Sequence, residues 1–504
     1  MAYLIGVDVG TQGVKAGLFD VNMNLAATAF VPSRLISPAP GVTWQEADDI
    51  YNGVVEALRQ LVQQSNVKPQ EILSVGIDSQ MAGIMGIDKN GEATTYYDSW
   101  LDTRCGRYVD EMKTRAGRRI IGITGSPVTY AHGPKILWWK HENPEAYGKT
   151  AKFVLPHTYV VGKMTGLQAE ESYFDHTCIQ YSGFGDNLNK KWSEELLELF
   201  DIDKNKMARI VSPFEVVGKV TPEFARISGI PAGTPVTAGA GDTAASIFGA
   251  GMLEKDLLLD CAGTASALCS VVDQYVPDTE HETLTMMRSP IDGYWFPLAY
   301  INGGGLCIRW FRDEFTGKPP VSYKELEEDA MKIEPGSEGI IFIPHFAGRV
   351  LPNNQDLRGS FIGLDWKHTR AHLFRAVMEG IAYEYAYYLK VLKELYPNGG
   401  FDTMHAIGGG GKSDLFLKIK SDVLGVKAVS FDTGDTALIG SAVIAGVGTG
   451  VFDDYKKPIR RAMKIRKELS YDIENTRLYK PYTSTYLKTI DALTTVYRNE
   501  VYKK

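Results

Sequence analysis

The chain has 504 residues, of which 44% are hydrophobic and 23% charged, and this length suits two globular domains of about 250 residues each. The formal net charge of −7 argues against a protein that binds nucleic acid or an anionic membrane surface. The five cysteines form no Cys-x-x-Cys pair, and no apolar run approaches the roughly 20 residues of a membrane helix. We therefore expect a cytoplasmic protein without a secretory signal, a membrane span or a structural zinc site.

The first element of the chain is a predicted hairpin with a tight glycine corner. Two apolar runs, Leu4–Val9 and Val14–Phe19, flank the corner Gly10-Thr11-Gln12-Gly13. Glycine lets main-chain N–H groups approach a ligand closely, and the Thr11 hydroxyl adds a further donor. Such donors suit a phosphate group, and the carboxylate of Asp8 suits the Mg²⁺ that accompanies it. Taken alone, this stretch fits an ordinary surface hairpin equally well.

The next elements are a helix and a strand that ends in polar residues. Apolar residues recur at helical spacing over Glu46–Gln64, and a buried strand follows over Ile72–Asp78. The strand runs into Gln80-Met81-Ala82-Gly83, the position at which an α/β sheet presents groups to a ligand. Trp100-Leu-Asp-Thr-Arg104 lies in a predicted transition from loop to helix. From about residue 105 to residue 230 the pattern predicts a mostly helical region.

A second candidate site follows a strand near the middle of the chain. The strand Pro235–Ala238 leads through Gly239-Ala-Gly241 into Asp242 and Thr243, which begin an alanine-rich helix. Aspartate at a helix start is commonly an N-cap. Here the short glycine-rich approach also exposes the carboxylate of Asp242 at a strand end, where a ligand site would lie. We place the boundary between two domains, residues 1–250 and 251–504, directly after this helix.

The hairpin pattern recurs in the second half. Leu257–Val272 is again an apolar run, a corner at Gly263-Thr264 and another apolar run, about half a chain length after Gly10-Thr11. Two similar hairpins at this spacing indicate a duplicated α/β domain with both corners facing one central cleft. The phosphates of a nucleotide could then be held from both sides, as in actin-like and hexokinase-like ATPases. This arrangement is the predicted architecture.

Glycine-rich segments and helices follow in the second half. Asn302-Gly-Gly-Gly305 precedes an aromatic helix, and Leu373–Tyr396 has the pattern of a long amphipathic helix. His405–Asp414 predicts a strand, a loop of four glycines and a helix, an order that permits backbone contact with a phosphate or a flat ligand. Its spacing differs from that of the Gly-x-x-x-x-Gly-Lys-Ser/Thr phosphate loop. The basic run from Lys456 to Lys467 predicts a solvated helix rather than a nucleic-acid site.

Together these segments resemble the FGGY family of carbohydrate kinases over nearly the whole chain and in the family's order. The matching segments are Gly6–Lys15, Gln80–Gly83, Trp100–Arg104, Gly239–Ala245, Gly263-Thr264, Gly408–Ser413 and Ser421–Gly425. The resemblance implies two duplicated ribonuclease-H-like domains around a central cleft, ATP with Mg²⁺, and transfer of the γ-phosphoryl group to a hydroxyl of a small sugar or polyol. A homodimer is a weaker expectation from the family.

The resemblance also implies a role for individual residues. Asp242 would be the general base and would contact the substrate, and Asp8 would be the carboxylate on the metal side. The nucleotide side would be formed by Gly10, Thr11, Gln12, Lys15, Gly263, Thr264, Gly305, Gly409, Gly410 and Lys412. The sugar pocket would be formed by Gln80, Met81, Trp100 and Asp102, together with Asp242. Phosphoryl transfer requires such groups, namely donors to the phosphate, a positioned hydroxyl and a carboxylate that accepts its proton.

The chain also departs from the family pattern. Xylulokinase-like members, the most similar in overall pattern, usually carry His where this chain has Ala82, and often Asn where it has Thr243. In the adenine-side segment, Phe416 and Lys418 replace the usual Trp and Gln. The first two departures concern the sugar pocket. Because the overall pattern is most similar to xylulokinase-like members, D-xylulose is the first prediction for the substrate. Because the departures concern the sugar pocket, ribulose, gluconate, erythritol and glycerol remain open.

Several of these residues could instead have a purely structural role. Gln80 could satisfy backbone groups at its strand end, Trp100 could be part of a core, and Asp102 with Arg104 could form a structural ion pair. An ATP-driven conformational switch of the actin or chaperone type would share the phosphate hairpins. Such a switch would need neither the sugar-side segments nor a base aimed at a second substrate, and on this ground we predict the kinase.

Overall fold

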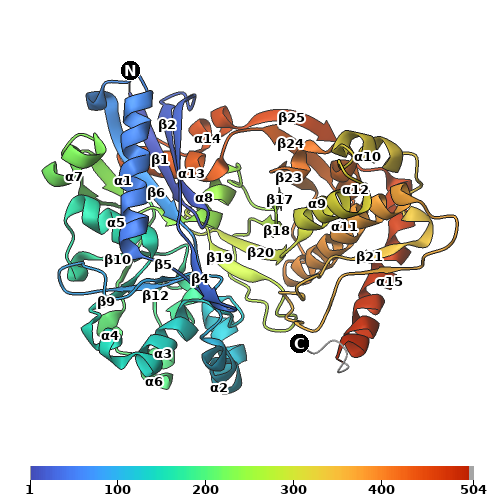
Figure 1. The fold of residues 1–504 in the computed structure, drawn as a ribbon, viewed down its shortest axis with the longest axis horizontal. Helices are drawn as coiled ribbons and strands as arrows, with labels where there is room; N and C mark the ends of the chain where they lie inside the picture. The colour runs from blue at the N-terminus through green and yellow to red at the C-terminus, as the bar shows by residue number, and fades with distance from the viewer. Residues whose placement is uncertain (1, 499–504) are drawn as a thin grey trace.

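The computed structural model describes residues 2–498, which form two α/β halves, each built on its own sheet (Figure 1). The strands of the first sheet, in spatial order, are β14 (Val216–Lys219), β15 (Pro235–Thr237), β6 (Ile72–Ser79), β1 (Tyr3–Val9), β2 (Gly13–Asp20) and β3 (Leu25–Pro32), with β16 (Ala240–Gly241) also paired to β6. Those of the second sheet are β19 (Thr285–Arg288), β20 (Trp295–Ile301), β18 (Ser266–Ser270), β17 (Leu257–Ala262), β23 (Thr403–Ile407), β24 (Lys427–Asp432) and β25 (Lys464–Leu469).

Both sheets use the same order of strands. In the first sheet, β3, β2 and β1 form an antiparallel meander, and β6 and β15 continue parallel to β1. In the second sheet, β20, β18 and β17 form the meander, and β23 and β24 continue parallel to β17. The two predicted hairpins are confirmed, with Val9 opposite Val14 and Ala262 opposite Ser266 beside the corners. The repeated strand pattern confirms that the α/β unit is duplicated.

Helices pack around both sheets and between them. In the first half they are α1 (Ala47–Gln64), α2 (Gly106–Thr124), α3 (His132–Glu142), α4 (Pro144–Lys149), α5 (Pro156–Thr165), α6 (Glu194–Leu199), α7 (Pro222–Ser228) and α8 (Asp242–Gly249). In the second half they are α9 (Gly304–Phe315), α10 (Tyr323–Ala330), α11 (Arg370–Leu395), α12 (Asp414–Leu424), α13 (Thr436–Gly448), α14 (Lys456–Ala462) and α15 (Ile473–Tyr497). The helices predicted over residues 46–64 and 373–396 agree with α1 and α11. Between residues 2 and 498, no helix has the length and apolar character needed to cross a membrane.

Two regions contain less helix than the sequence predicted, namely residues 105–230 and the basic run from Lys456 to Lys467. Short strands lie outside the two sheets, and several of them interrupt the region from residue 105 to residue 230. They are β4 (Ile36–Ala39), β5 (Val42–Gln45), β7 (Met85–Ile87), β8 (Tyr97–Asp98), β9 (Lys152–Val154), β10 (Tyr173–Asp175), β11 (Gly185–Asp186), β12 (Lys191–Trp192), β13 (Arg209–Val211), β21 (Ile341–Ile343) and β22 (Ser360–Ile362). The basic run is helical only in α14 and then enters β25, the edge strand of the second sheet. Charged residues are common in edge strands because one side of the strand faces solvent.

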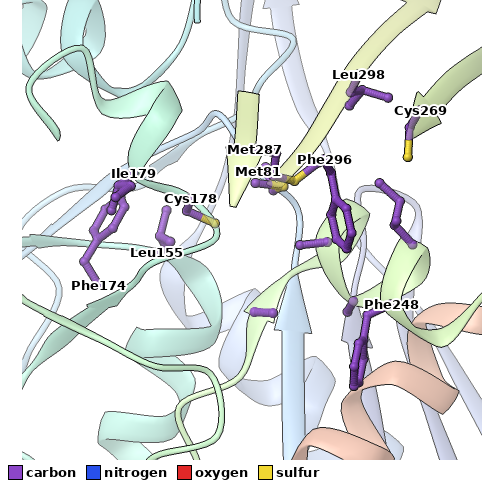
Figure 2. Close-up of a cluster of buried hydrophobic side chains, with 14 of the residues drawn as sticks. Met81, Leu155, Phe174, Cys178, Ile179, Phe248, Cys269, Met287, Phe296 and Leu298 are labelled. Atoms are coloured by element: carbon purple, nitrogen blue, oxygen red, sulfur yellow. The ribbon is translucent and has the colours of Figure 1, made fainter. Parts of the chain in front are cut away.

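Buried apolar side chains join the two halves as well as filling each of them. Within residues 2–498, one cluster packs the first sheet against α1, α5 and α7, and another packs the second sheet against α11, α12 and α15. A further cluster contains Met81 and Phe248 of the first half together with Met287 and Phe296 of the second half (Figure 2). The two halves therefore share packed side chains in addition to the chain connection.

Helix α13 belongs to the second half in sequence but packs on the first sheet. It contacts β1, β6 and α8, and it lies beside the blue strands of the first half in Figure 1. This contact requires glycine, because a Cβ on Gly6 or Gly76 would lie 2.2 or 2.1 Å from a carbonyl oxygen of α13. Ser441 of α13 also donates a hydrogen bond of 2.5 Å to the carboxylate of Asp78 in β6. The second half of the chain is in this way brought directly onto the strands that carry Asp8 and Asp78.

Candidate active site

Both glycine corners are tight turns at the ends of paired strands. In the first corner the Gly10 N–H donates to the Gly13 carbonyl at 3.1 Å, and in the second the Gly263 N–H donates to the Ala265 carbonyl at 2.9 Å. The first corner leaves Thr11 half-buried and Gln12 exposed, and the second leaves Gly263, Thr264 and Ala265 exposed. Each corner therefore presents polar groups at the surface, as a phosphate site requires.

A cavity of about 560 Å³ lies beside the second corner. Its lining includes these residues predicted for the nucleotide side: Gly263, Thr264, Gly305, Gly409, Gly410 and Lys412. Apolar side chains of α9, α11 and α12 line it as well, among them Ile308, Phe374, Met378 and Phe416. A cavity of this size, with polypeptide backbone and flat apolar side chains in its walls, suits an adenine nucleotide.

Two glycines of this cavity are required by close backbone contacts. A Cβ on Gly305, at the start of α9, would lie 2.0 Å from the carbonyl oxygen of Gly263. A Cβ on Gly410 would lie 2.4 Å from the Cβ of Ala262. The second corner, the start of α9 and the glycine loop therefore touch one another directly. A side chain at Gly305 or Gly410 would force these segments apart and change the cavity.

Three polar side chains in the cavity lining were not found from the sequence. They are Arg309 of α9 and Tyr323 and Glu327 of α10. Burial raises the pKa of Glu327 above its usual value, although the hydrogen bond from Ser413 opposes this. No spacing in the sequence connects these residues with the glycine loop, because they reach it only when α9, α10 and α12 pack together.

A second cavity, of about 410 Å³, extends from the nucleotide wall toward the first half of the chain. It shares Gly263, Gly409 and Lys412 with the first cavity, and Ser246 of α8 and Thr436 of α13 also line it. The hydroxyl groups of Ser246 and Thr436 are 2.7 Å apart and hydrogen-bonded. The two cavities therefore share a wall, and the second one adjoins α8 and α13, which contact the first sheet.

Carboxylates gather around Asp435, which lines the second cavity. Asp8 stands opposite Asp78 in the parallel pairing of β1 and β6. Lys15 Nζ lies 2.7 Å from Asp435 Oδ2 and 3.8 Å from Asp8 Oδ2. Burial, reinforced by the negative charge of Asp435, raises the pKa of Asp8 to about 6. Lys15, predicted for the nucleotide side, therefore lies between two carboxylates at the edge of the second cavity.

A divalent cation fits this group of carboxylates. Asp8 and Asp435 flank one lysine, while burial and the neighbouring Asp8 raise the pKa of Asp78 well above its usual value, so a cation would offset the negative charge that Lys15 leaves on Asp8 and Asp435. Within residues 2–498, no group of three or more His, Cys, Asp or Glu side chains is placed to hold a metal ion by itself. Mg²⁺ usually binds through one or two carboxylates and completes its coordination with water and substrate phosphates. The site thus suits Mg²⁺ that arrives with a nucleotide.

Asp242 is the first residue of α8 and directly follows the N-cap residue Gly241. Its Oδ1 accepts hydrogen bonds from the Thr243 N–H at 2.5 Å and from the Thr243 hydroxyl at 3.0 Å. Burial, reinforced by the negative charge of Asp8, raises the pKa of Asp242 to about 7. Met81, predicted for the sugar side, is buried against this segment, since a Cβ on Gly241 would lie 2.5 Å from Met81 Sδ. A carboxylate with a pKa near neutrality can act as a proton acceptor at neutral pH.

Hydrogen bonds connect the residues predicted for the sugar side to the first corner. Trp100 Nε1 donates to Thr11 Oγ1 at 2.9 Å, and the Thr11 hydroxyl donates to Gln80 Oε1 at 3.1 Å. Gln80 Nε2 in turn donates to Gln45 Oε1 at 2.5 Å. Trp100 is 47% exposed and is therefore not a core residue, while Gln80 is buried and uses its amide group to bind side chains. The structure thus brings Thr11, which was predicted for the nucleotide side, into contact with Gln80 and Trp100.

Asp102 fixes the loop that carries Trp100. Its Oδ2 accepts a hydrogen bond of 2.8 Å from the Thr43 N–H and forms an ion pair of 2.8 Å with Arg104 Nε. Lys135, which is buried, donates to the Asp102 carbonyl at 2.7 Å. Asp102 is itself only 2% exposed. These contacts favour the structural ion pair over a direct contact between Asp102 and a substrate.

Comparisons with known proteins identify the family. The N-terminal domain of the FGGY family of carbohydrate kinases matches residues 3–249, and its C-terminal domain matches residues 261–449. The chain belongs to the FGGY family. A xylulose kinase of Bacillus subtilis (strain 168) is 28% identical over 493 residues, which cover 96% of each chain. A gluconokinase of the same organism is 26% identical over 465 residues, which cover 90% of this chain and 89% of the relative.

Solved structures of FGGY kinases share the fold. A ligand-bound xylulose kinase from Lactobacillus acidophilus has a TM-score of 0.91 at 24% identity, over 99% of each chain. A glycerol kinase from Plasmodium falciparum with ADP has a TM-score of 0.88 at 20% identity, over 98% of each chain. The predicted two-domain fold of actin-like and hexokinase-like ATPases is confirmed. As an FGGY kinase, the chain is an enzyme that phosphorylates a carbohydrate with ATP as the donor, which sets the conformational switch aside.

Proposed function

We propose that this FGGY kinase transfers the γ-phosphoryl group of ATP to a hydroxyl of a ketopentose, with D-xylulose as the first candidate. The support for this substrate is the similarity to xylulose kinases over nearly the whole chain. Other small substrates must be tested beside D-xylulose, because one relative is a gluconokinase and because Ala82 departs from the xylulokinase-like pattern in the sugar-side segment. These substrates are ribulose, gluconate, erythritol and glycerol.

In this proposal the nucleotide extends along the two adjoining cavities. The adenine base would pack between the apolar side chains of the 560 Å³ cavity, including Phe416, and the phosphates would point along the second cavity. Backbone and hydroxyl groups of Gly263, Thr264, Gly305, Gly409 and Gly410 would hold the nucleotide from the second half, with Lys412 offsetting phosphate charge. Gly10, Thr11 and Gln12 would meet the γ-phosphate from the first half. Lys15 would stay beside Asp8 and Asp435, where it limits their mutual repulsion.

Asp8 would hold Mg²⁺ together with phosphate oxygens and water. When bound there, the cation offsets charge on the phosphates during transfer. The raised pKa of Asp8 is physical support for this role, since a carboxylate destabilised by its neighbours is stabilised by an added cation.

The observation that carries the proposal is the position and the pKa of Asp242. Asp242 is the first residue of α8, and Ser246 of the same helix lines the second cavity. Burial and the negative charge of Asp8 raise the pKa of Asp242 to about 7. As the substrate oxygen attacks the γ-phosphorus and ADP leaves, Asp242 would accept the proton of that hydroxyl. Gln80, Met81 and Trp100 would form the sugar side of the site. Asp102 would contribute by holding the loop of Trp100.

The test is ADP release from ATP by the wild type and by Asp242→Asn, with D-xylulose, D-ribulose, gluconate, erythritol and glycerol. We expect one substrate to give turnover and Asp242→Asn to lose about 10²- to 10⁴-fold of it. Asp48→Asn, an exposed change in the first turn of α1, is the matched control and should keep full activity. Turnover of a substrate that survives Asp242→Asn would refute the base assignment, and a different preferred substrate would replace D-xylulose.

A further inference from the structure

A series of buried polar side chains next to Asp242 has no part in the proposed chemistry. Its members are Ser79 at the end of β6, His157 in α5, Asp175 at the end of β10, and Thr177, and each is 0% exposed. His157 Nδ1 lies 2.7 Å from Ser79 Oγ, and His157 Nε2 lies 3.2 Å from Asp175 Oδ2, an ion-pair distance without the geometry of a hydrogen bond. Thr177 donates its N–H at 2.9 Å, and also its hydroxyl, to Asp175 Oδ1.

This series closes into a ring at the residue before Asp242. The Gly241 N–H donates a hydrogen bond of 3.0 Å to the Thr177 hydroxyl. Gly241 also stands opposite Ser79 in the parallel pairing of β16 and β6, so the ring returns to its starting point through the main chain. Burial by itself would raise the pKa of Asp175, but the contacts with His157 and Thr177 hold this pKa below its usual value.

Close packing against β6 also constrains the segment before Asp242. Gly239 has a φ of +78°, and a Cβ at this position would lie 1.8 Å from the carbonyl oxygen of Ile77. Met81 packs against Gly241, as described above. The strand and Met81 therefore limit where the segment lies, while the Thr177 hydroxyl sets the direction of the Gly241 N–H.

A serine, a histidine and an aspartate in series also occur in hydrolases, where the serine attacks a substrate. Here all three side chains are 0% exposed and none of them lines either of the two cavities, so the serine is not placed to attack a substrate. The ring therefore acts on the protein itself, and buried polar networks of this kind make the elements they connect more rigid.

We propose that His157 and Asp175 are positioning residues for Asp242. Through Thr177 they hold the Gly241 N–H, and with it the first turn of α8, where Asp242 can accept the proton of the sugar hydroxyl. The inference rests on the proposed function, in which Asp242 is the base. A displacement of about 1 Å at a catalytic group can cost about 10²-fold in rate. Because the ring contacts neither substrate, its loss should lower kcat and leave KM for the sugar and for ATP unchanged.

The kinetic test uses Asp175→Asn, His157→Gln and the pair Thr177→Val and Thr177→Ser. We expect the first three to lower kcat by about 10- to 100-fold with unchanged KM values, and Thr177→Ser, which keeps the hydroxyl, to retain kcat. His345→Gln is the matched control, because His345 is also a buried histidine with a carboxylate partner, Glu384, at 3.5 Å, but in the second half. A kcat loss as large in His345→Gln would show general destabilisation and overturn the proposal.

Hydrogen exchange at the Gly241 amide gives a second readout that needs no substrate. Exchange should be faster in Asp175→Asn and Thr177→Val than in the wild type, and unchanged in His345→Gln. If the wild type turns over a sugar but kcat and Gly241 exchange are both unchanged in the ring variants, the positioning proposal is wrong and the kinase function stands. If the wild type turns over no sugar while exchange rises as expected, the proposed substrates are wrong, but the hold of the ring on Gly241 is supported.

Discussion

Trp100 and Thr11 are joined by a hydrogen bond of 2.9 Å between the indole Nε1 and the hydroxyl oxygen, across 89 positions of the chain. Trp100 lies on the loop fixed by Asp102 and Lys135, and Thr11 lies in the first glycine corner. This contact and the one from Thr11 to Gln80 place the proposed sugar side directly against the proposed phosphate corner. A change on either side therefore acts on both substrates.

Replacement of Trp100 by Phe tests this contact. The variant keeps an aromatic ring but leaves the Thr11 hydroxyl without its donor, which is worth about 0.5–1.5 kcal/mol. We expect kcat/KM for the sugar to fall by about 3- to 10-fold. Trp366→Phe is the control, because Trp366 is fully exposed on the second half. Equal steady-state parameters for the wild type and Trp100→Phe would show that the bond does not contribute to turnover.

The pH dependence of kcat/KM follows from the pKa of Asp242. The base must be ionised to accept a proton, and its pKa in the free enzyme is about 7, raised by burial and by Asp8. We expect kcat/KM for the sugar to fall about tenfold per pH unit below pH 7 and to level off above it. Initial rates at subsaturating sugar and Mg²⁺·ATP between pH 5.5 and 8.5 measure this dependence for the free enzyme. A rate that is constant down to pH 5.5 would contradict the assigned pKa.

Gly305→Ala should damage the nucleotide cavity without touching the sugar side. The added Cβ would lie 2.0 Å from the Gly263 carbonyl oxygen, so the second corner must move away from α9. We expect KM for ATP to rise about tenfold or more while KM for the sugar stays close to that of the wild type. Gly148→Ala in α4 is the matched helical control, since a Cβ there meets nothing within 4 Å. An unchanged KM for ATP in Gly305→Ala would place the nucleotide elsewhere.

In the protein without ligands, the buried carboxyl groups should contribute more to stability as the pH falls from 8 toward 5, while the buried His132 and His176, whose pKa values burial lowers, contribute less. Burial raises the pKa of Asp98 and Asp242 to about 7 and that of Asp8 to about 6. A carboxyl group whose pKa is raised on folding binds its proton more tightly in the folded state. Its contribution to stability is therefore complete below its unfolded pKa near 4 and is lost as the pH rises through 6 to 7.

The variant Asp242→Asn isolates one of these groups. It removes a destabilising charge at pH 8, so its Tm should exceed that of the wild type by about 2–4 °C. At pH 5 the wild-type carboxyl is already protonated in the folded state, and the difference should become clearly smaller. Thermal unfolding at pH 5, 6, 7 and 8 without nucleotide provides the comparison. A Tm difference that is larger at pH 5 than at pH 8 would have the wrong sign for a raised pKa.

The variant Asp8→Asn tests the proposed metal contact. At a fixed ATP concentration, we expect the Mg²⁺ concentration for half-maximal activity to rise about tenfold, because one carboxylate ligand is lost. Asp432→Asn is the control, since Asp432 is an exposed aspartate at the end of β24. The proposal fails if both variants require the same Mg²⁺ concentration as the wild type.

Much of the fold follows from local sequence patterns. The two hairpins, α1, β6 and α11 were predicted because apolar spacing and glycine corners act over a few neighbouring residues. The same reasoning failed for the basic run, where β25 exists only because β24 offers it an edge to pair with. The glycines predicted for the nucleotide side do line one cavity, while Arg309, Tyr323 and Glu327 of the same lining were missed because separate helices deliver them.

By itself, the sequence determined the duplication of the domain and the order of strand, glycine and carboxylate that places Asp8 and Asp242 at strand ends. These features depend on backbone conformation and apolar periodicity, and both are set mainly by residues that are close together in the sequence. Only the tertiary structure decided that α13 packs on the first sheet, that Trp100 bonds to Thr11, and that the ring of His157 and Asp175 closes at Gly241. Such contacts join residues that are tens to hundreds of positions apart. They arise from packing between separate elements, and no local pattern encodes them.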